Sequence, residues 1–114
     1  MLVHGDAHPG NVLEAGPEGT RFKLIDPDGA VSEPAYDLAI PLREWNAELL
    51  EAGVGLAVPW CASTSRLTGV AAQAIWEWSF VERVSTGLFL LRLGHTGPAA
   101  AYLTVADALA DVDP

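Results

Sequence analysis

Residues 4–11 read HGDAHPGN and residues 24–29 read LIDPDG, two polar stretches rich in Gly, Pro and Asp that are expected to form loops. Between them, Val12 to Ala15 and Arg21 to Ile25 have the composition of short strands, separated by the turn signal Gly-Pro-Glu-Gly at 16–19. This pattern predicts a β-hairpin whose ends hold Asn11 and Asp26 close together. The Pro and Gly that follow Asp26 then end the second strand.

Beyond residue 33 the apolar residues recur at helical spacing. We expect one helix from Ala35 to about Ala52, an irregular apolar segment from Val54 to Pro59, and a long helical segment from Ser63 to Leu93. Gly87 would mark a kink or a break in that segment. A last helix is expected from Ala99 to Ala110.

The expected architecture is therefore α+β and mainly α, with residues 1–114 forming a single domain that contains one small β-hairpin. An isolated two-stranded hairpin is marginal in water, so it must lean on the helices or on a part that the chain lacks.

Fifteen acidic side chains face six basic ones, giving a formal net charge of −9. A field of this sign repels nucleic acid and anionic membranes and attracts cationic ligands.

No apolar run approaches the roughly 18–20 residues needed to span a bilayer. The first residues, MLV, lead directly into HGD, unlike a secretory signal, so we expect a cytoplasmic protein. Cys61, the only cysteine, is expected to be a packing residue or a bystander.

The polar residues of the two loops have the types and spacing that phosphoryl transfer from a nucleotide requires. Asp6 can orient an attacking hydroxyl and receive its proton. Asn11, five residues later, offers a neutral oxygen ligand that adds no repulsion beside Asp6, and Asp26 offers a charged one. Magnesium favours such hard oxygen ligands, with water and phosphate completing its shell.

The pattern His-Gly-Asp-x-His-x-x-Asn followed by Ile-Asp-x-Asp resembles the catalytic and metal-binding loops of the aminoglycoside phosphotransferase family. Residues 33–39, EPAYDLA, and 81–88, VERVSTGL, resemble the streptomycin 6-kinase and hydroxyurea phosphotransferase branch. The resemblance implies the C-terminal lobe of a protein-kinase-like fold. It also implies an antibiotic-resistance activity, the phosphorylation of an alcohol group on a small cationic molecule such as an aminoglycoside, with ATP and Mg²⁺.

By this resemblance Asp6 is the catalytic base, and Asn11 and Asp26 bind magnesium. Asp28 is left open between a metal contact, a substrate contact and a turn residue. Asp37 would be a buried acid that braces the catalytic loop, and His4 would be part of that brace. The remaining supporting residue is His8.

A complete enzyme of this kind also has a nucleotide lobe, with a glycine-rich flap and a strand lysine that precede the catalytic loop. Here the loop begins at residue 4, and the only lysine, Lys23, follows it. We therefore expect a truncated or partial enzyme whose partners include a missing N-terminal lobe or other copies of the chain.

Two alternatives stand beside the kinase interpretation. The chain is a non-catalytic kinase-like remnant or partner-binding module, or it is a metal hydrolase that uses the alternating His4, Asp6 and His8.

Trp78 is expected to pack in the core. Several acidic residues are expected to form a solvated face: Glu77, Glu82, Asp107, Asp111 and Asp113.

Overall fold

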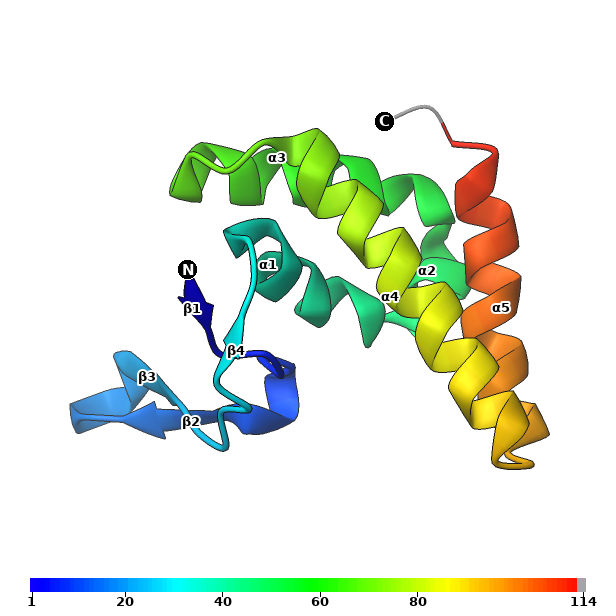
Figure 1. Cartoon of the computed structure of the whole chain (residues 1–114). Coiled ribbons are helices and arrows are strands. Elements are labelled where there is room, and N and C mark those ends of the chain that lie inside the picture. Colours follow the sequence, from blue (N-terminus) through cyan, green and yellow to red (C-terminus); the bar gives the residue numbers. More distant parts are fainter. Residues whose placement is uncertain (113–114) are drawn as a thin grey trace.

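A computed structural model describes residues 1–112, and in that range the chain is mainly helical with two small antiparallel sheets. The expectation of a mainly α chain with a minor β part is confirmed. The helices gather into one body, and the strands lie to one side of it (Figure 1). None of the helices formed by residues 1–112 is both long enough and apolar enough to cross a membrane.

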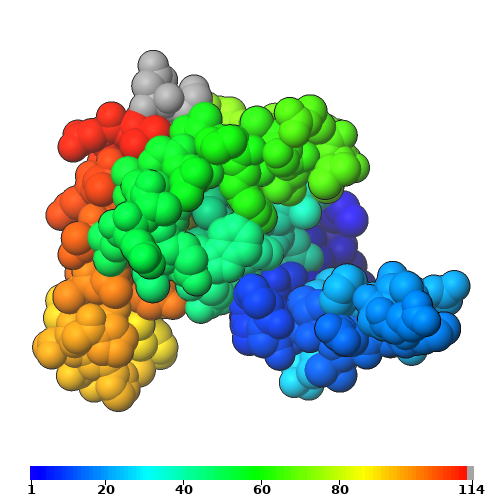
Figure 2. All heavy atoms as spheres, turned by 180° about the vertical axis from the view of Figure 1, so that it is seen from behind, coloured from blue at the N-terminus to red at the C-terminus, as the bar shows by residue number. Residues whose placement is uncertain are grey.

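The predicted hairpin is present. Strand β2 (Val12–Ala15) pairs with β3 (Arg21–Leu24), and the register places Val12 opposite Leu24. The turn between them contains the short 3-10 helix η2 (Pro17–Gly19). Every residue of β3 is exposed, and the hairpin projects from the helical body (Figure 2).

A second sheet was not expected from the sequence. Strand β1 (Leu2–Val3) pairs with β4 (Ala30–Val31), and Met1 and Ser32 exchange two backbone hydrogen bonds of 2.9 Å beside the pair. Strands of two residues are too short to show an alternating pattern, so the sequence carried no signal for them. The β1–β4 pair forms a neck, which brings the two ends of residues 4–29 together. Both loops of interest lie within that segment.

The first predicted helix is wrong in its extent, because it is two helices, α1 (Pro34–Arg43) and α2 (Asn46–Ala52). The reason lies in a distant contact. Nη2 of Arg83 donates to the Leu42 carbonyl at 2.5 Å, and Nε donates to Asn46 Oδ1 at 2.8 Å. A continuous helix would bond that carbonyl to the Asn46 amide, but here it accepts the buried guanidinium of Arg83 and, at 3.2 Å, the amide of Trp45.

The long predicted helical segment is also divided, but not at Gly87. Helix α3 (Ala57–Thr68) ends at Gly69, whose φ of +76° is the left-handed conformation of a helix cap, and α4 (Ala72–Arg92) follows. Helix α3 begins inside the segment expected to be irregular, after the 3-10 helix η3 (Val54–Leu56). Helix α5 (Thr96–Ala110) begins three residues before the predicted start at Ala99.

Gly87 lies in the uninterrupted middle of α4, where α5 packs against it. A Cβ atom at this position would lie 2.8 Å from Leu103 Cδ2 and 3.1 Å from Tyr102 Cβ. The glycine therefore serves close helix packing rather than a kink.

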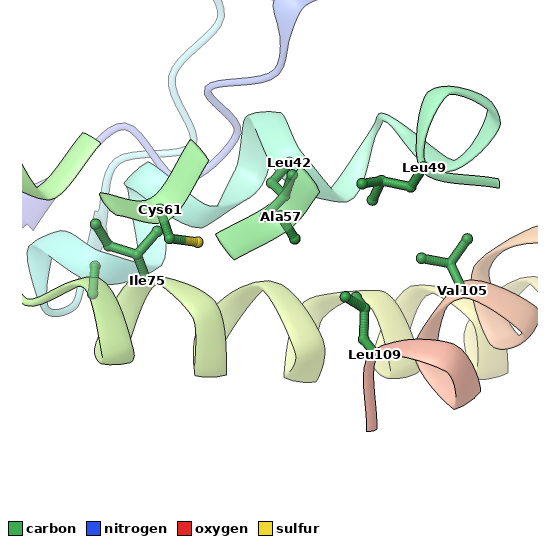
Figure 3. Close-up of a cluster of buried hydrophobic side chains, with 8 residues drawn as sticks. Leu42, Leu49, Ala57, Cys61, Ile75, Val105 and Leu109 are labelled. Carbon is green, nitrogen blue, oxygen red and sulfur yellow. The ribbon is translucent and has the colours of Figure 1, made fainter. Parts of the chain in front are cut away.

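The hydrophobic core draws on all five α-helices of the described range, and its side chains point toward one another between them (Figure 3). Cys61 is one of its buried members, and burial raises the pKa of its thiol to about 11. Cys61 is thus a packing residue, as expected. Trp78 is half-buried against the same cluster. The buried members are Ala35, Leu42, Leu49, Ala57, Cys61, Ile75, Val105 and Leu109.

Substitution of Gly87 by Ala should lower the free energy of unfolding by about 1–3 kcal/mol, because the added methyl overpacks the α4–α5 contact. Gly97→Ala is the matched control in α5, since nothing lies within 4 Å of a Cβ there. It should leave stability unchanged or raise it by up to about 1 kcal/mol. Urea unfolding followed by circular dichroism measures both, and a stabilised Gly87→Ala variant would contradict the packing role.

Candidate active site

His4 joins the two loops. Its backbone carbonyl accepts hydrogen bonds from the amides of Asp28 at 2.8 Å and Gly29 at 3.2 Å. Its ring lies 2.8 Å, through Nε2, from the Ile25 carbonyl, and Nδ1 accepts from the Asp6 amide at 3.2 Å. This pattern corresponds to a ring with its proton on Nε2 and a lone pair on Nδ1. Both ring nitrogens are therefore occupied within the protein.

Asp37, in the first turn of α1, holds the start of the loop formed by residues 4–11. Its carboxylate accepts the backbone amide of His4 at 2.7 Å and that of Gly5 at 2.8 Å. Gly5 is buried with a φ of +88°, and a Cβ there would lie 3.0 Å from Asp28 Cβ. Only glycine suits both this conformation and this close approach of the two loops.

Asp6 is held on several sides yet remains open to solvent, with 35% of its side chain exposed. Asn11 Nδ2 donates to its carbonyl at 2.9 Å and to its Oδ2 at 3.2 Å. His8 Nε2 also lies 3.5 Å from Oδ2. On the other oxygen, Oδ1, the nearest charged group is Nη2 of Arg43 at 3.5 Å. The arrangement presents a fixed carboxylate to an incoming group.

Asn11 and Asp26 are brought close together by the base of the hairpin. The carbonyl of Asn11, the last residue of the 3-10 helix η1 (Pro9–Asn11), accepts the Ile25 amide at 2.8 Å, and Asp26 follows directly. Asn11 is buried and commits its Nδ2 to Asp6, which leaves Oδ1 as an available acceptor. Asp26 is exposed and has a φ of +52°, a conformation that costs energy for residues other than glycine. Asp28 is exposed on the same loop.

Asn11 and Asp26 offer an amide oxygen and a carboxylate that could hold magnesium bound to a nucleotide. One carboxylate and one amide oxygen are typical protein ligands of Mg²⁺ when phosphate oxygens and water complete the shell. Among residues 1–112 no three His, Cys, Asp or Glu side chains form a group that could hold a metal ion. Because both nitrogens of His4 are also engaged, the hydrolase set of His4, Asp6 and His8 loses its geometric basis.

Arg43 is a site residue that the sequence reasoning missed. It lies in the last turn of α1, with 13% of its side chain exposed. Besides Asp6, its guanidinium contacts Glu44 Oε1 at 2.7 Å and Glu82 Oε2 at 3.2 Å. Burial acts to lower the pKa of Arg43, but the two glutamates outweigh it and the pKa is raised. Arg43 is therefore a permanent cation beside Asp6.

Glu82 was expected on a solvated acidic face, and for this residue the expectation is wrong. Its side chain is only 17% exposed and pairs with Arg43. Its neighbour Arg83 is fully buried, and burial lowers its pKa to about 10, so it still carries its charge at neutral pH. Asp113 lies outside the residues that the structure describes.

Comparison of the chain with protein-family models, curated proteins and solved structures gives no match.

Replacing Asp37 by Ala should lower the free energy of unfolding by about 1–3 kcal/mol for each of the two amides that it leaves without an acceptor. Asp107→Ala removes an exposed acid from α5 and should change stability by less than about 0.5 kcal/mol. Amide hydrogen exchange measured by NMR should show faster exchange at His4 and Gly5 in the Asp37 variant alone. Unchanged exchange at both amides would mean that Asp37 does not hold the loop.

Proposed function

We propose that this chain carries the catalytic-loop half of a phosphotransferase of the aminoglycoside kinase type. The reaction would move the terminal phosphoryl group of ATP to an alcohol group on a small cationic molecule. The observation that supports it best is the hydrogen bonding of both loops to His4. Through its carbonyl and its ring, this one residue contacts the chain on either side of Asp26 and the amide of Asp6.

Asp6 has the role of orienting the acceptor hydroxyl and receiving its proton. Its partial exposure lets a substrate reach it, and the contact from Asn11 fixes its orientation. Positioning of this kind is most of what a phosphotransferase supplies, because the transferred group needs little covalent help from the protein.

Asn11 and Asp26 are the residues that would hold Mg²⁺, which when bound offsets the charge of the phosphates. Asn11 Oδ1 is available for this purpose and Asp26 is exposed. Asp28 follows on the same turn, and its amide is committed to His4. We assign Asp28 to the shaping of this turn, with its exposed carboxylate free for a metal or a substrate.

A cationic substrate is favoured by the charge around the site. The chain carries a net charge of −9, and Glu44 and Glu82 lie beside Arg43 near Asp6. Arg43 offsets part of that charge, so the arrangement can attract an amine without drawing it into a contact with Asp6. Aminoglycosides, which carry several amines and many hydroxyls, match this requirement.

A second candidate, a partner-binding module, is favoured by an exposed apolar surface. Leu2 is 69% exposed, Phe22 66% and Val31 83%. Apolar side chains of β1, β3 and α1 also line a depression of about 530 Å³ that reaches His4. Surfaces of this kind mark places where another protein element packs. A nucleotide lobe supplied in trans is the partner that would reconcile this candidate with the first.

Incubation with Mg-ATP and streptomycin should give a phosphorylated product that mass spectrometry detects. Asp6→Asn removes the proton acceptor but keeps the shape of the side chain, and should lower the rate about 10²–10⁴-fold. Asp107→Asn makes the same chemical change on an exposed face of α5 and should leave the rate unchanged. Circular dichroism should show that both variants are folded.

Metal binding gives a readout that does not require turnover. Paramagnetic Mn²⁺ with ATP should broaden the NMR signals of Asn11 and Asp26, and Asp26→Asn should weaken this effect. A chain that yields neither product nor selective broadening would overturn the proposal. Broadening without product would support the metal site and direct the assay toward an added nucleotide lobe.

A further inference from the structure

A cavity of about 350 Å³ opens among α2, η3 and α3, next to the end of α1. This volume is within the range of small-molecule sites. The lining is apolar apart from two side chains, Glu48 of α2 and Ser63 of α3. None of Asp6, Asn11 or Asp26 lines it. The cavity is therefore separate from the candidate active site and needs its own explanation.

Two tryptophans form part of the wall. The ring centroids of Trp45 and Trp60 are 5.5 Å apart, and their planes are inclined by 88°. Both rings line the cavity and also pack against the hydrophobic core, which holds them in position. The pair is edge-to-face, so the edge of one indole meets the face of the other. An indole face that is not covered in this way is a negative π surface, which attracts cations.

Within residues 1–112, Glu48 is the only residue with a formal charge that lines this cavity. It lies in the first turn of α2 and is exposed, at the rim rather than in the core. Arg66 also reaches this side of α3, where its Nη2 donates to Ser63 Oγ at 3.0 Å. Solvent and salt screen both exposed charges, but Glu48 lines the cavity and Arg66 does not. The chemistry of the cavity is thus aromatic with one carboxylate.

We propose that this cavity binds a small organic ammonium ion with an apolar body. The apolar part would fill the cavity, the cation would lie against the indoles, and Glu48 would offset its charge. A polyhydroxylated amine is a poor occupant, because its hydroxyls would be buried without partners. The inference is independent of the proposed phosphoryl transfer, and the failure of either leaves the other standing.

The test uses the full chain labelled with ¹⁵N, in which the indole N–H signals report on each tryptophan. The probe is phenyltrimethylammonium, and 2-phenylpropan-2-ol is a neutral molecule of similar shape. Titration with the cation should shift the signals of Trp45 and Trp60 to saturation. Trp76 and Trp78 do not line the cavity and serve as internal controls. The neutral alcohol should bind about tenfold more weakly, the difference expected for a lost cation–π and charge contact.

Variants at the rim separate the local carboxylate from the overall negative charge. Glu48→Gln should weaken binding of the cation about fivefold or more, with little effect on the neutral alcohol. Glu51→Gln is the matched control, because Glu51 is an exposed acid of the same helix that does not line the cavity. It should change the affinity less than about twofold.

Three results would overturn the proposal. Equal affinity for the cation and the alcohol would reduce the cavity to an unselective apolar hollow. Equal weakening by the Glu48 and Glu51 variants would assign the attraction to net charge alone. Shifts at all four indoles together, or at none, would show that the cation does not bind in this cavity. A folded Trp60→Phe variant that loses binding would support the aromatic wall directly.

Discussion

Two short hydrogen bonds, from the amides of His4 and Gly5 to the carboxylate of Asp37, are the constraint on which the site depends. They fix the start of the loop formed by residues 4–11 to the first turn of α1. His4 then fixes the second loop, through its carbonyl and its ring. Without the carboxylate, the first loop would keep weaker contacts with α1, from Arg43 to Asp6 at 3.5 Å and from the Tyr36 hydroxyl to the Gly5 carbonyl at 3.5 Å.

The helical body has a comparable anchor in Arg83. A buried cation is costly unless it is satisfied, and Arg83 is satisfied in part by groups at the junction of α1 and α2. Next to it on α4, Glu82 reaches Arg43, which in turn reaches Asp6. Two adjacent residues of α4 therefore have separate roles. Arg83 contacts the bend after α1, and Glu82 pairs with Arg43 beside the candidate site. The fold and the candidate chemistry share these side chains.

The sequence predicted what depends on local pattern. The hairpin followed from turn residues between two strand-like runs, and the helical content followed from apolar spacing. The sequence-based prediction was wrong where a side chain from a distant part of the chain determines the local structure. The break after Arg43 depends on Arg83, forty residues away, and the packing role of Gly87 depends on α5. Gly69, a local signal of a helix end, was available and was overlooked. The two-residue strands carried no pattern to find.

For the candidate site, Asp6, Asn11 and Asp26 could be selected because their types and spacing relate to one chemistry. Arg43, Glu82 and Arg83 could not be placed the same way, since ion pairs between helices leave no periodic trace in a sequence. The geometry adds the neighbours that hold Asp6 and the available oxygen of Asn11. It also separates an aromatic cavity from the loops, a division that composition alone does not reveal.

The neck formed by β1 and β4 has a consequence for the order in which the chain folds. The bonds that fix the first residues of the chain to Ser32 and to α1 join residues 31–33 positions apart, whereas helices form from neighbours. Closing so long a loop costs entropy before any bond compensates for it. The helices can therefore form first, and the loops acquire their shape only when α1 is available to receive them. The residues of the candidate site are therefore expected to become ordered after the helices.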